Sequence, residues 1–280
     1  MAEDQAVSLP KINMNYIGGI VGDYYGSVYE FHNFDRTKPV FDVELTKSGE
    51  FTDDTVLTIA VMDWLNSCGG TDTNLLATKL KMWGRKYGHA SYGPRFKSWL
   101  WSDNNEPIGS FGNGSAMRVS PCAYYANTLE ECLDLAEKSA IVTHNTDNGV
   151  TGAKAIAEAI YLARSGAGKE DMKRILAEDF VYDLDKPLEE IGTESHSFDA
   201  TCQITVPEAI MCFLNGFDFI DTIKKSIWIG GDSDTIACMA GSIAEAYYGI
   251  PHCVMEEFKS RFPQDMKDVI IKFNENVLRR

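Results

Sequence analysis

The sequence predicts an all-α fold, a compact multi-helix bundle built as a single domain over residues 1–280. Three observations lead to this prediction. Several long segments place apolar residues at helical spacing, the candidate strand patterns are short, and 44% of the residues are hydrophobic. A chain of this length and composition can bury a substantial core and is near the upper size of one domain.

The first predicted helix spans residues 14–30 and carries Gly18, Gly22 and Gly26 at intervals of four. This spacing puts the three glycines on one helix face. Each glycine costs about 1 kcal/mol relative to alanine inside a helix, so we expect that face to approach another backbone or a ligand closely. Glu30 ends this predicted helix, where the helix dipole disfavours a carboxylate and a functional role is therefore favoured.

The next helix follows the stretch EFTDDT and is apolar on nearly every side over residues 56–65, which predicts a buried helix. Residues 148–164 and 234–248 are rich in Ala and Gly, so these helices can pack tightly. Further helices are expected at residues 73–87, 128–140, 169–178, 205–214, 218–227 and 254–277. Residues 91–122 and 180–203 are rich in Gly, Ser, Asn, Asp and Pro and are therefore expected to form loops, and loops of this length are typical of functional or mobile segments.

The charge balance excludes some classes of partner. The chain has 41 acidic residues against 26 Lys and Arg, a net charge of −15, without a run of like charge. We therefore expect neither direct nucleic-acid binding nor attachment to an anionic membrane. If the ligand is itself an anion, a metal ion or backbone N–H groups must hold it.

The cysteines and the apolar segments predict the compartment. Seven scattered cysteines without a C-x-x-C pair indicate reduced thiols rather than disulfides or a zinc site. The acidic start of the chain lacks the apolar stretch of a signal peptide, and no run approaches the roughly 18 apolar residues of a membrane span. We expect a soluble, cytoplasmic protein; its oligomeric state is not indicated.

Two clusters of oxygen-bearing side chains each precede a buried helix, about 180 residues apart. Their members are Thr52, Asp53 and Asp54 in the first and Asp232, Asp234 and Thr235 in the second. Helix capping explains one such residue per helix but not the surplus. If the helices are neighbours, four carboxylates repel one another unless a cation is bound. Oxygen ligands favour Mg²⁺, Mn²⁺ or Ca²⁺, and six of them suit two ions about 3.5–4 Å apart.

A glycine-rich stretch, GSFGNGSAMRVSP at residues 109–121, has two interpretations. Its backbone N–H groups can face a phosphate, with Arg118 beside them. Alternatively, it is a tight connection into a helix containing Met117. His144, in THNTDNG at residues 143–149, is either a ligand contact or a histidine held by local hydrogen bonds.

Taken together, GGIVGDYYGSVYEF, FTDDTVLTIAVMDWL, GNGSAMRVSP, THNTDNG and IGGDSDTIACMAGSIAEAYYGIP resemble, in order and spacing, the ADP-ribosylglycohydrolase family. The match covers about residues 12–255. The resemblance implies an all-α, orthogonally packed fold with a cleft that holds two Mg²⁺ or Mn²⁺ ions. It further implies that the ligands of these ions are Thr52, Asp53, Asp54, Asp232, Asp234 and Thr235.

The resemblance also implies the substrate and the reaction. Gly112, Asn113, Gly114 and Ser115 fall where the family holds the diphosphate of ADP-ribose, and His144 falls in the substrate-proximal loop. The implied reaction is hydrolysis of the bond between C1″ of ADP-ribose and an acceptor. Its general acid/base is a carboxylate: Glu30, which matches a glutamate that some members use near C1″, or metal-bound Asp53 or Asp234.

Three functions remain open at this point. The first is a binuclear-metal-dependent hydrolase of ADP-ribosylated proteins or of small-molecule ADP-ribose conjugates. The second is a non-catalytic relative of the same fold that binds ADP-ribose or a nucleotide, or has a structural role. The third is a metal hydrolase of another bond, such as a phosphoester. The acceptor is not indicated by the sequence.

Overall fold

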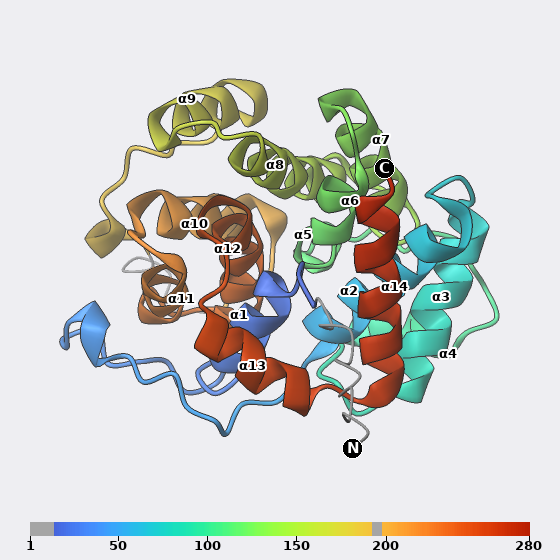
Figure 1. Cartoon of the computed structure of the whole chain (residues 1–280), viewed down its shortest axis with the longest axis horizontal. Helices are drawn as coiled ribbons and strands as arrows, with labels where there is room; N and C mark the ends of the chain where they lie inside the picture. Colours follow the sequence, from blue (N-terminus) through green and yellow to red (C-terminus); the bar gives the residue numbers. More distant parts are fainter. Residues whose placement is uncertain (1–13, 192–197) are drawn as a thin grey trace, which may run out of the picture.

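The protein is all-α, as predicted, in a computed structural model that describes residues 14–191 and 198–280 (Figure 1). The helices are α1 (Gly18–Gly26), η1 (Val40–Asp42), α2 (Asp53–Cys68), α3 (Thr73–Lys86), α4 (Pro94–Trp101), α5 (Gly114–Met117), α6 (Ser120–Tyr125), α7 (Leu129–Ile141), α8 (Asp147–Arg164), α9 (Lys169–Phe180), η2 (Leu188–Glu190), α10 (Cys202–Asn215), α11 (Phe219–Trp228), α12 (Ser233–Tyr248), α13 (His252–Arg261) and α14 (Gln264–Leu278). Within the described ranges the nearest approach to a sheet is a single antiparallel bridge between Gly112 and Thr201.

Helices α1 and α12 pack against each other at the centre of the molecule (Figure 1). A Cβ atom added to Gly22 would overlap the carbonyl oxygen of Ala237, and one added to Gly26 would lie 2.5 Å from the Cα atom of Asp234. The predicted glycine face is therefore confirmed, and its neighbour is the backbone of α12. This contact fixes the start of α12 against the end of α1.

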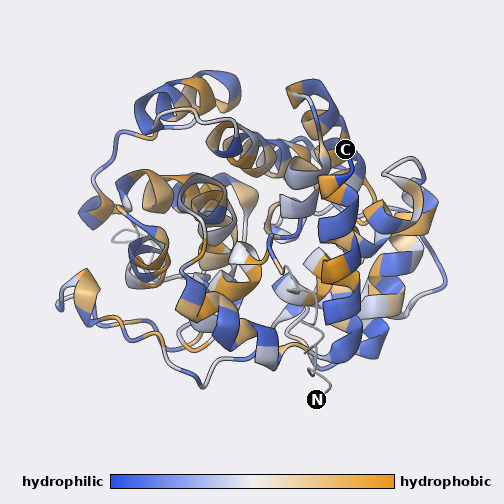
Figure 2. Cartoon of the chain, in the orientation of Figure 1, coloured by the Kyte–Doolittle hydropathy of each residue, from blue (hydrophilic) through white to orange (hydrophobic). Residues whose placement is uncertain are grey.

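The other helices surround this pair. α12 also packs against α8, α10 and α11, while α2 packs against α1, α3, α6 and α14. The side chains of α2 are buried along nearly its whole length, as the apolar run predicted. Figure 2 shows hydrophilic and hydrophobic residues alternating along peripheral α14, whose buried residues include Met266, Ile270 and Phe273. In the described ranges, none of the helices has both the length and the apolar character required to cross a membrane.

The first helix is shorter than predicted. The backbone of Tyr16 has a φ of 67°, and α1 begins only at Gly18 and ends at Gly26. Glu30 therefore lies four residues beyond the helix, in a loop, so the prediction that it ends the helix is wrong. The dipole of α1 therefore does not disfavour its carboxylate.

Two other segment predictions are wrong. The helix expected over residues 254–277 is broken into α13 and α14, because Pro263 lacks an N–H group and forces Phe262 into an extended conformation with ψ of 138°. The loop expected over 91–122 contains α4, α5 and α6. Proline in the first turn favours the start of α4 and α6, where the sequence prediction treated it as a loop signal.

The loop expected over residues 180–203 contains η2 and runs into α10 at Cys202. Its residues 192–197 lie outside the described ranges.

Candidate active site

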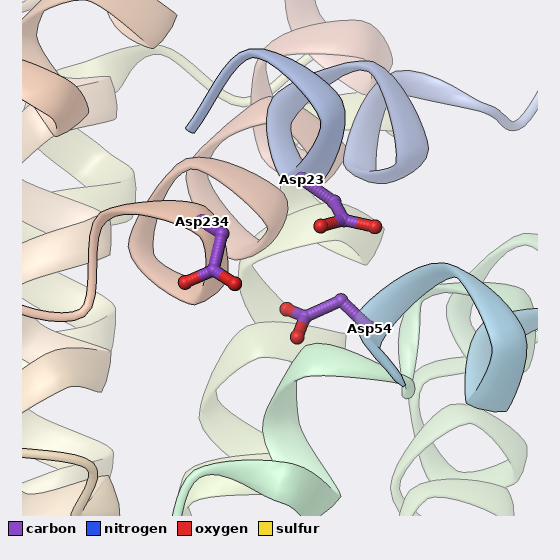
Figure 3. Close-up of side chains that lie close together, drawn as sticks. All are labelled: Asp23, Asp54 and Asp234. Carbon is purple, nitrogen blue, oxygen red and sulfur yellow. The ribbon is translucent and has the colours of Figure 1, made fainter. Parts of the chain in front are cut away.

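Three helices bring three carboxylates together at the centre of the fold (Figure 3). Asp23 comes from α1, Asp54 from the start of α2 and Asp234 from the start of α12, and one oxygen of each lies within 4.8 Å of the others. In a second group, made of Glu30, Asp232 and Asp234, one oxygen of each residue also lies within 4.8 Å of the others. The two groups share Asp234. The two clusters predicted from the sequence are therefore neighbours in space.

Helix capping involves few of the clustered carboxylate and hydroxyl oxygens. Thr52 is the N-cap of α2, and its hydroxyl accepts a hydrogen bond of 3.3 Å from the Asp54 N–H. Asp232 stands at the N-cap position of α12 but makes no capping bond. Instead, one of its oxygens accepts a 2.7 Å bond from the side-chain amide of Asn113. The carboxylates are thus available for another purpose.

Asp23 is a site residue that the sequence analysis missed. Its buried carboxylate accepts bonds from the N–H (3.0 Å) and hydroxyl (2.7 Å) of Thr52, and from the N–H (3.2 Å) and hydroxyl of Thr55. It therefore positions the first turn of α2, which carries Asp54. One signal was available: Asp23 is four residues after Gly19 and three before Gly26, on a helix face that contacts other backbone.

The charges of this cluster repel one another. Burial, followed by the charges of Asp234 and Asp23, raises the pKa of Asp54 well above its usual range. Burial, followed by the charges of Asp232 and Asp23, does the same for the pKa of Asp234. Burial raises the pKa of Asp232 to about 6, against the effect of its hydrogen bonds. A bound cation would relieve this repulsion.

The hydrogen bonding of one carboxylate oxygen indicates whether the cluster suits a metal ion. Oδ1 of Asp54 is buried and has no hydrogen-bond partner, whereas both oxygens of Asp23 accept bonds from Thr52 and Thr55. A buried oxygen without a donor is costly unless a ligand satisfies it. The donor set is entirely oxygen, which suits Mg²⁺ or Mn²⁺. The site therefore fits a hard divalent cation next to Asp54.

The remaining predicted metal ligands lie around the same centre. The Thr235 hydroxyl donates to Oδ2 of Asp54 at 3.3 Å, and the Thr52 hydroxyl does so at the same distance. Asp53 lines the same cleft, although it belongs to neither of the close carboxylate groups. Burial, followed by the charges of Asp234 and Asp23, raises its pKa well above the usual range.

Asp54, Asp232 and Asp234 line a cleft of about 300 Å³. Its lining also includes Gly112, Gly114, His144 and the exposed side chain of Arg95. Arg95 donates a 2.7 Å bond to the carbonyl of Ile108 and has no carboxylate partner among the ion pairs of the described residues. The cleft thus combines carboxylates that can attract a cation with backbone and an arginine that can attract an anion.

The glycine-rich loop contacts the carboxylate cluster directly. The Asn113 amide holds Asp232, and its backbone N–H donates to the carbonyl of Ala200 at 2.8 Å. Ser115 does not line the cleft, because its buried hydroxyl donates to the Gly149 carbonyl at 2.7 Å. A ligand contact by Ser115 can therefore involve only its backbone N–H, while Gly112 and Gly114 face the cleft directly.

The interpretation of His144 as a histidine held by a local hydrogen bond is confirmed, and its contact with a ligand stays a prediction. His144 lines the cleft, and its Nδ1 lies 2.7 Å from the Thr143 hydroxyl, which also accepts a 2.8 Å bond from Arg118. Burial, followed by the charges of Arg118 and Arg95, lowers the pKa of His144 well below its usual range, so the ring is neutral. Arg118 also lines the cleft, although its side chain is fully buried, and its Nε and Nη1 atoms have no partner.

Comparisons with known proteins agree with this geometry. A family profile described as ADP-ribosylglycohydrolase matches residues 10–279. The chain belongs to the ADP-ribosylglycohydrolase family. Family membership supports a hydrolase that acts on ADP-ribose conjugates.

Individual relatives match most of the length of this chain. It is 29% identical to the human protein named ADP-ribosylhydrolase ARH3, over 88% of this chain and 87% of the relative. It is 26% identical to the ADP-ribosylarginine hydrolase Tri1 of Pseudomonas putida, over 84% of this chain and 69% of the relative. A solved structure described as an ADP-ribosylglycohydrolase-related protein complex superposes with a TM-score of 0.71 at 22% identity, covering 94% of this chain and 96% of that one.

Proposed function

We propose that this ADP-ribosylglycohydrolase is a binuclear-metal-dependent enzyme that cleaves the C1″ glycosidic bond between ADP-ribose and a protein side chain or another acceptor. The observation that carries the proposal is the unpartnered Oδ1 of buried Asp54, which lies among the carboxylates that line the cleft. Helix capping does not account for this oxygen, whereas a bound divalent cation would satisfy it.

We propose that the different chemical groups lining the cleft orient the substrate. The diphosphate of ADP-ribose would lie against Gly112 and Gly114, where the positive charge of Arg95 is nearby. The ribose that carries the acceptor would then extend toward Glu30 and Asp234. Because the chain has a net charge of −15, this local arrangement is what allows it to bind an anion.

Asp54, Asp232 and Asp234 would hold the two Mg²⁺ or Mn²⁺ ions, together with Thr52, Asp53 and Thr235. When bound, the ions supply orientation of the ribose hydroxyls and of a water molecule. The chain itself supplies the rest of the site. Asp23 holds the first turn of α2 through Thr52 and Thr55, and Asn113 holds Asp232 through its amide.

Glu30 is the residue we propose for proton transfer, with metal-bound Asp53 or Asp234 as the alternative. It is half-buried at the cleft, in the group that contains Asp232 and Asp234. In the reaction, the bond from C1″ to the acceptor breaks, the acceptor leaves with a proton, and water adds its oxygen to C1″. The products are ADP-ribose and the free acceptor.

The proposed function is tested by release of ADP-ribose from ADP-ribosylated proteins with and without EDTA. We expect EDTA to abolish release and added Mg²⁺ or Mn²⁺ to restore it, because the carboxylate cluster requires its cations. Release that survives EDTA, or that survives Asp53→Ala combined with Asp232→Ala, contradicts the proposal. ADP-ribose binding without turnover on any acceptor supports the non-catalytic alternative instead.

Glu30→Gln separates proton transfer from binding. We expect kcat to fall roughly 100-fold with little change in KM, because the amide keeps the shape of the side chain but cannot transfer the proton. Steady-state kinetics give both values. The rise in Tm on adding Mn²⁺ should persist in this variant; its loss would show that Glu30 acts as a metal ligand instead.

A further inference from the structure

Two phenylalanines at the mouth of the cleft are exposed without an evident structural reason. Phe31 is 70% exposed and Phe198 is 51% exposed. Their rings stack on each other, with centroids 6.1 Å apart and an interplanar angle of 22°. Such a pair contributes little to the core, yet it leaves aromatic surface open to solvent. We call these two residues the mouth pair.

The mouth pair adjoins the reacting end of the cleft. Phe198 lines the cleft, and Phe31 directly follows Glu30 in the loop after α1. This loop is held over the start of α12, where the Asn33 side chain accepts a 3.1 Å bond from the Gly231 N–H. If C1″ lies near Glu30, the group attached to C1″ leaves the cleft past the mouth pair. This step rests on the proposed function.

The chemistry of the mouth favours one class of acceptor. Glu30 and Asp199 are the sequence neighbours of the two phenylalanines, and the chain carries a net charge of −15. A guanidinium is planar, so it can stack on an aromatic face, and it is cationic, so acidic surroundings attract it. A serine acceptor has neither a face nor a charge. A nucleobase can stack, but its phosphate backbone is repelled by this surface.

We infer that Phe31 and Phe198 are specificity-determining residues that select a guanidinium acceptor, the ADP-ribosylated side chain of arginine. The pair recognises the acceptor after the diphosphate and ribose have bound elsewhere in the cleft. Replacing either ring therefore changes the choice among conjugates and leaves the affinity for free ADP-ribose unchanged.

The experiment compares three conjugates: two peptides of identical sequence, ADP-ribosylated on arginine or on serine, and an ADP-ribosylated single-stranded oligonucleotide. We expect the unmodified chain to prefer the arginine peptide. In Phe31→Ala and in Phe198→Ala, kcat/KM for that peptide should fall about 5- to 20-fold, the range of a partly desolvated cation–π contact. The value for the serine peptide should change less than about twofold, and Phe31→Tyr should restore the arginine preference.

A matched control is Phe41→Ala in η1, since Phe41 is 74% exposed and does not line the cleft. This variant should behave as the unmodified chain. Calorimetry with free ADP-ribose distinguishes acceptor recognition from stacking on adenine. Weaker ADP-ribose binding in Phe31→Ala, an equal loss on arginine and serine peptides, or a preference for serine or the oligonucleotide overturns the inference.

The inference and the proposed function can fail separately. If none of the three conjugates is hydrolysed, the proposed function fails for the arginine, serine and nucleic-acid acceptors. The mouth pair is then tested by calorimetric binding of the intact arginine conjugate. Affinity that is unchanged in Phe31→Ala and Phe198→Ala overturns the inference, while a 5- to 20-fold loss, about the same cation–π range, supports it.

Discussion

Asp54→Asn is expected to reduce ADP-ribose release roughly 1000-fold and, in metal-free buffer, to raise the melting temperature of the protein. The loss of activity follows from the loss of a metal ligand, because bound ions contribute several kcal/mol of stabilisation and each ~1.4 kcal/mol is a factor of ten in rate. The gain in stability follows because a neutral side chain removes one charge from a buried cluster that repels itself. The free energy of unfolding should increase by about 1 kcal/mol.

The sign of the stability change decides between two roles for Asp54. If the carboxylate only stabilises the start of α2, its removal weakens the interaction with the helix dipole and lowers the melting temperature. Thermal unfolding in EDTA measures the change. Asp72→Asn is the matched control, because Asp72 caps α3 through the N–H groups of Asn74 and Leu75, and asparagine caps equally well. It should alter neither activity nor stability.

Gly22→Ala is expected to destabilise the protein by about 3 kcal/mol and to reduce activity in the molecules that remain folded. The added Cβ overlaps the carbonyl oxygen of Ala237, so α1 and α12 must move apart, and overpacking of this kind costs up to about 3 kcal/mol. The movement displaces Asp23 on one helix and Asp234 on the other. Urea unfolding and metal-supported turnover measure the two effects.

Gly168→Ala is the control for this substitution. Gly168 precedes α9 with φ of −71°, and a Cβ added there meets nothing within 4 Å. The free energy of unfolding of this variant should stay within about 1 kcal/mol of that of the unmodified chain, since alanine is only a poorer N-cap than glycine. If Gly22→Ala behaves like this control, close contact between α1 and α12 does not hold the site together.

Much of the fold could be predicted because a helix that is apolar on nearly every side is stable only when it is buried. The helix after EFTDDT and the glycine face of residues 14–30 were both interpreted correctly as buried and closely packed. The helix boundaries were harder to predict because a proline can either start a helix or interrupt one. Pro94 starts α4 but was treated as a loop signal, whereas Pro263 separates two helices inside a pattern that looked continuous.

The candidate site was predictable only in part, since it forms from distant segments. The Asp54 and Asp234 clusters were recognisable because each holds more carboxylates than a helix start needs. Asp23 was missed, since its one sign in the sequence is its place beside the glycines of an apolar helix, and its partners Thr52 and Thr55 come from another segment. The stacking of Phe31 on Phe198 depends on packing between segments 167 residues apart in sequence and leaves no trace in either stretch.

Calorimetric titration of Mg²⁺ or Mn²⁺ into the metal-free protein tests the central claim most directly, because it measures the cations themselves. The account predicts that the unmodified chain binds two ions, as expected for a two-metal site. Asp54→Asn should bind at least one ion fewer, while Asp72→Asn should bind both. Absence of binding by the unmodified chain, or unchanged binding by Asp54→Asn, would contradict the account.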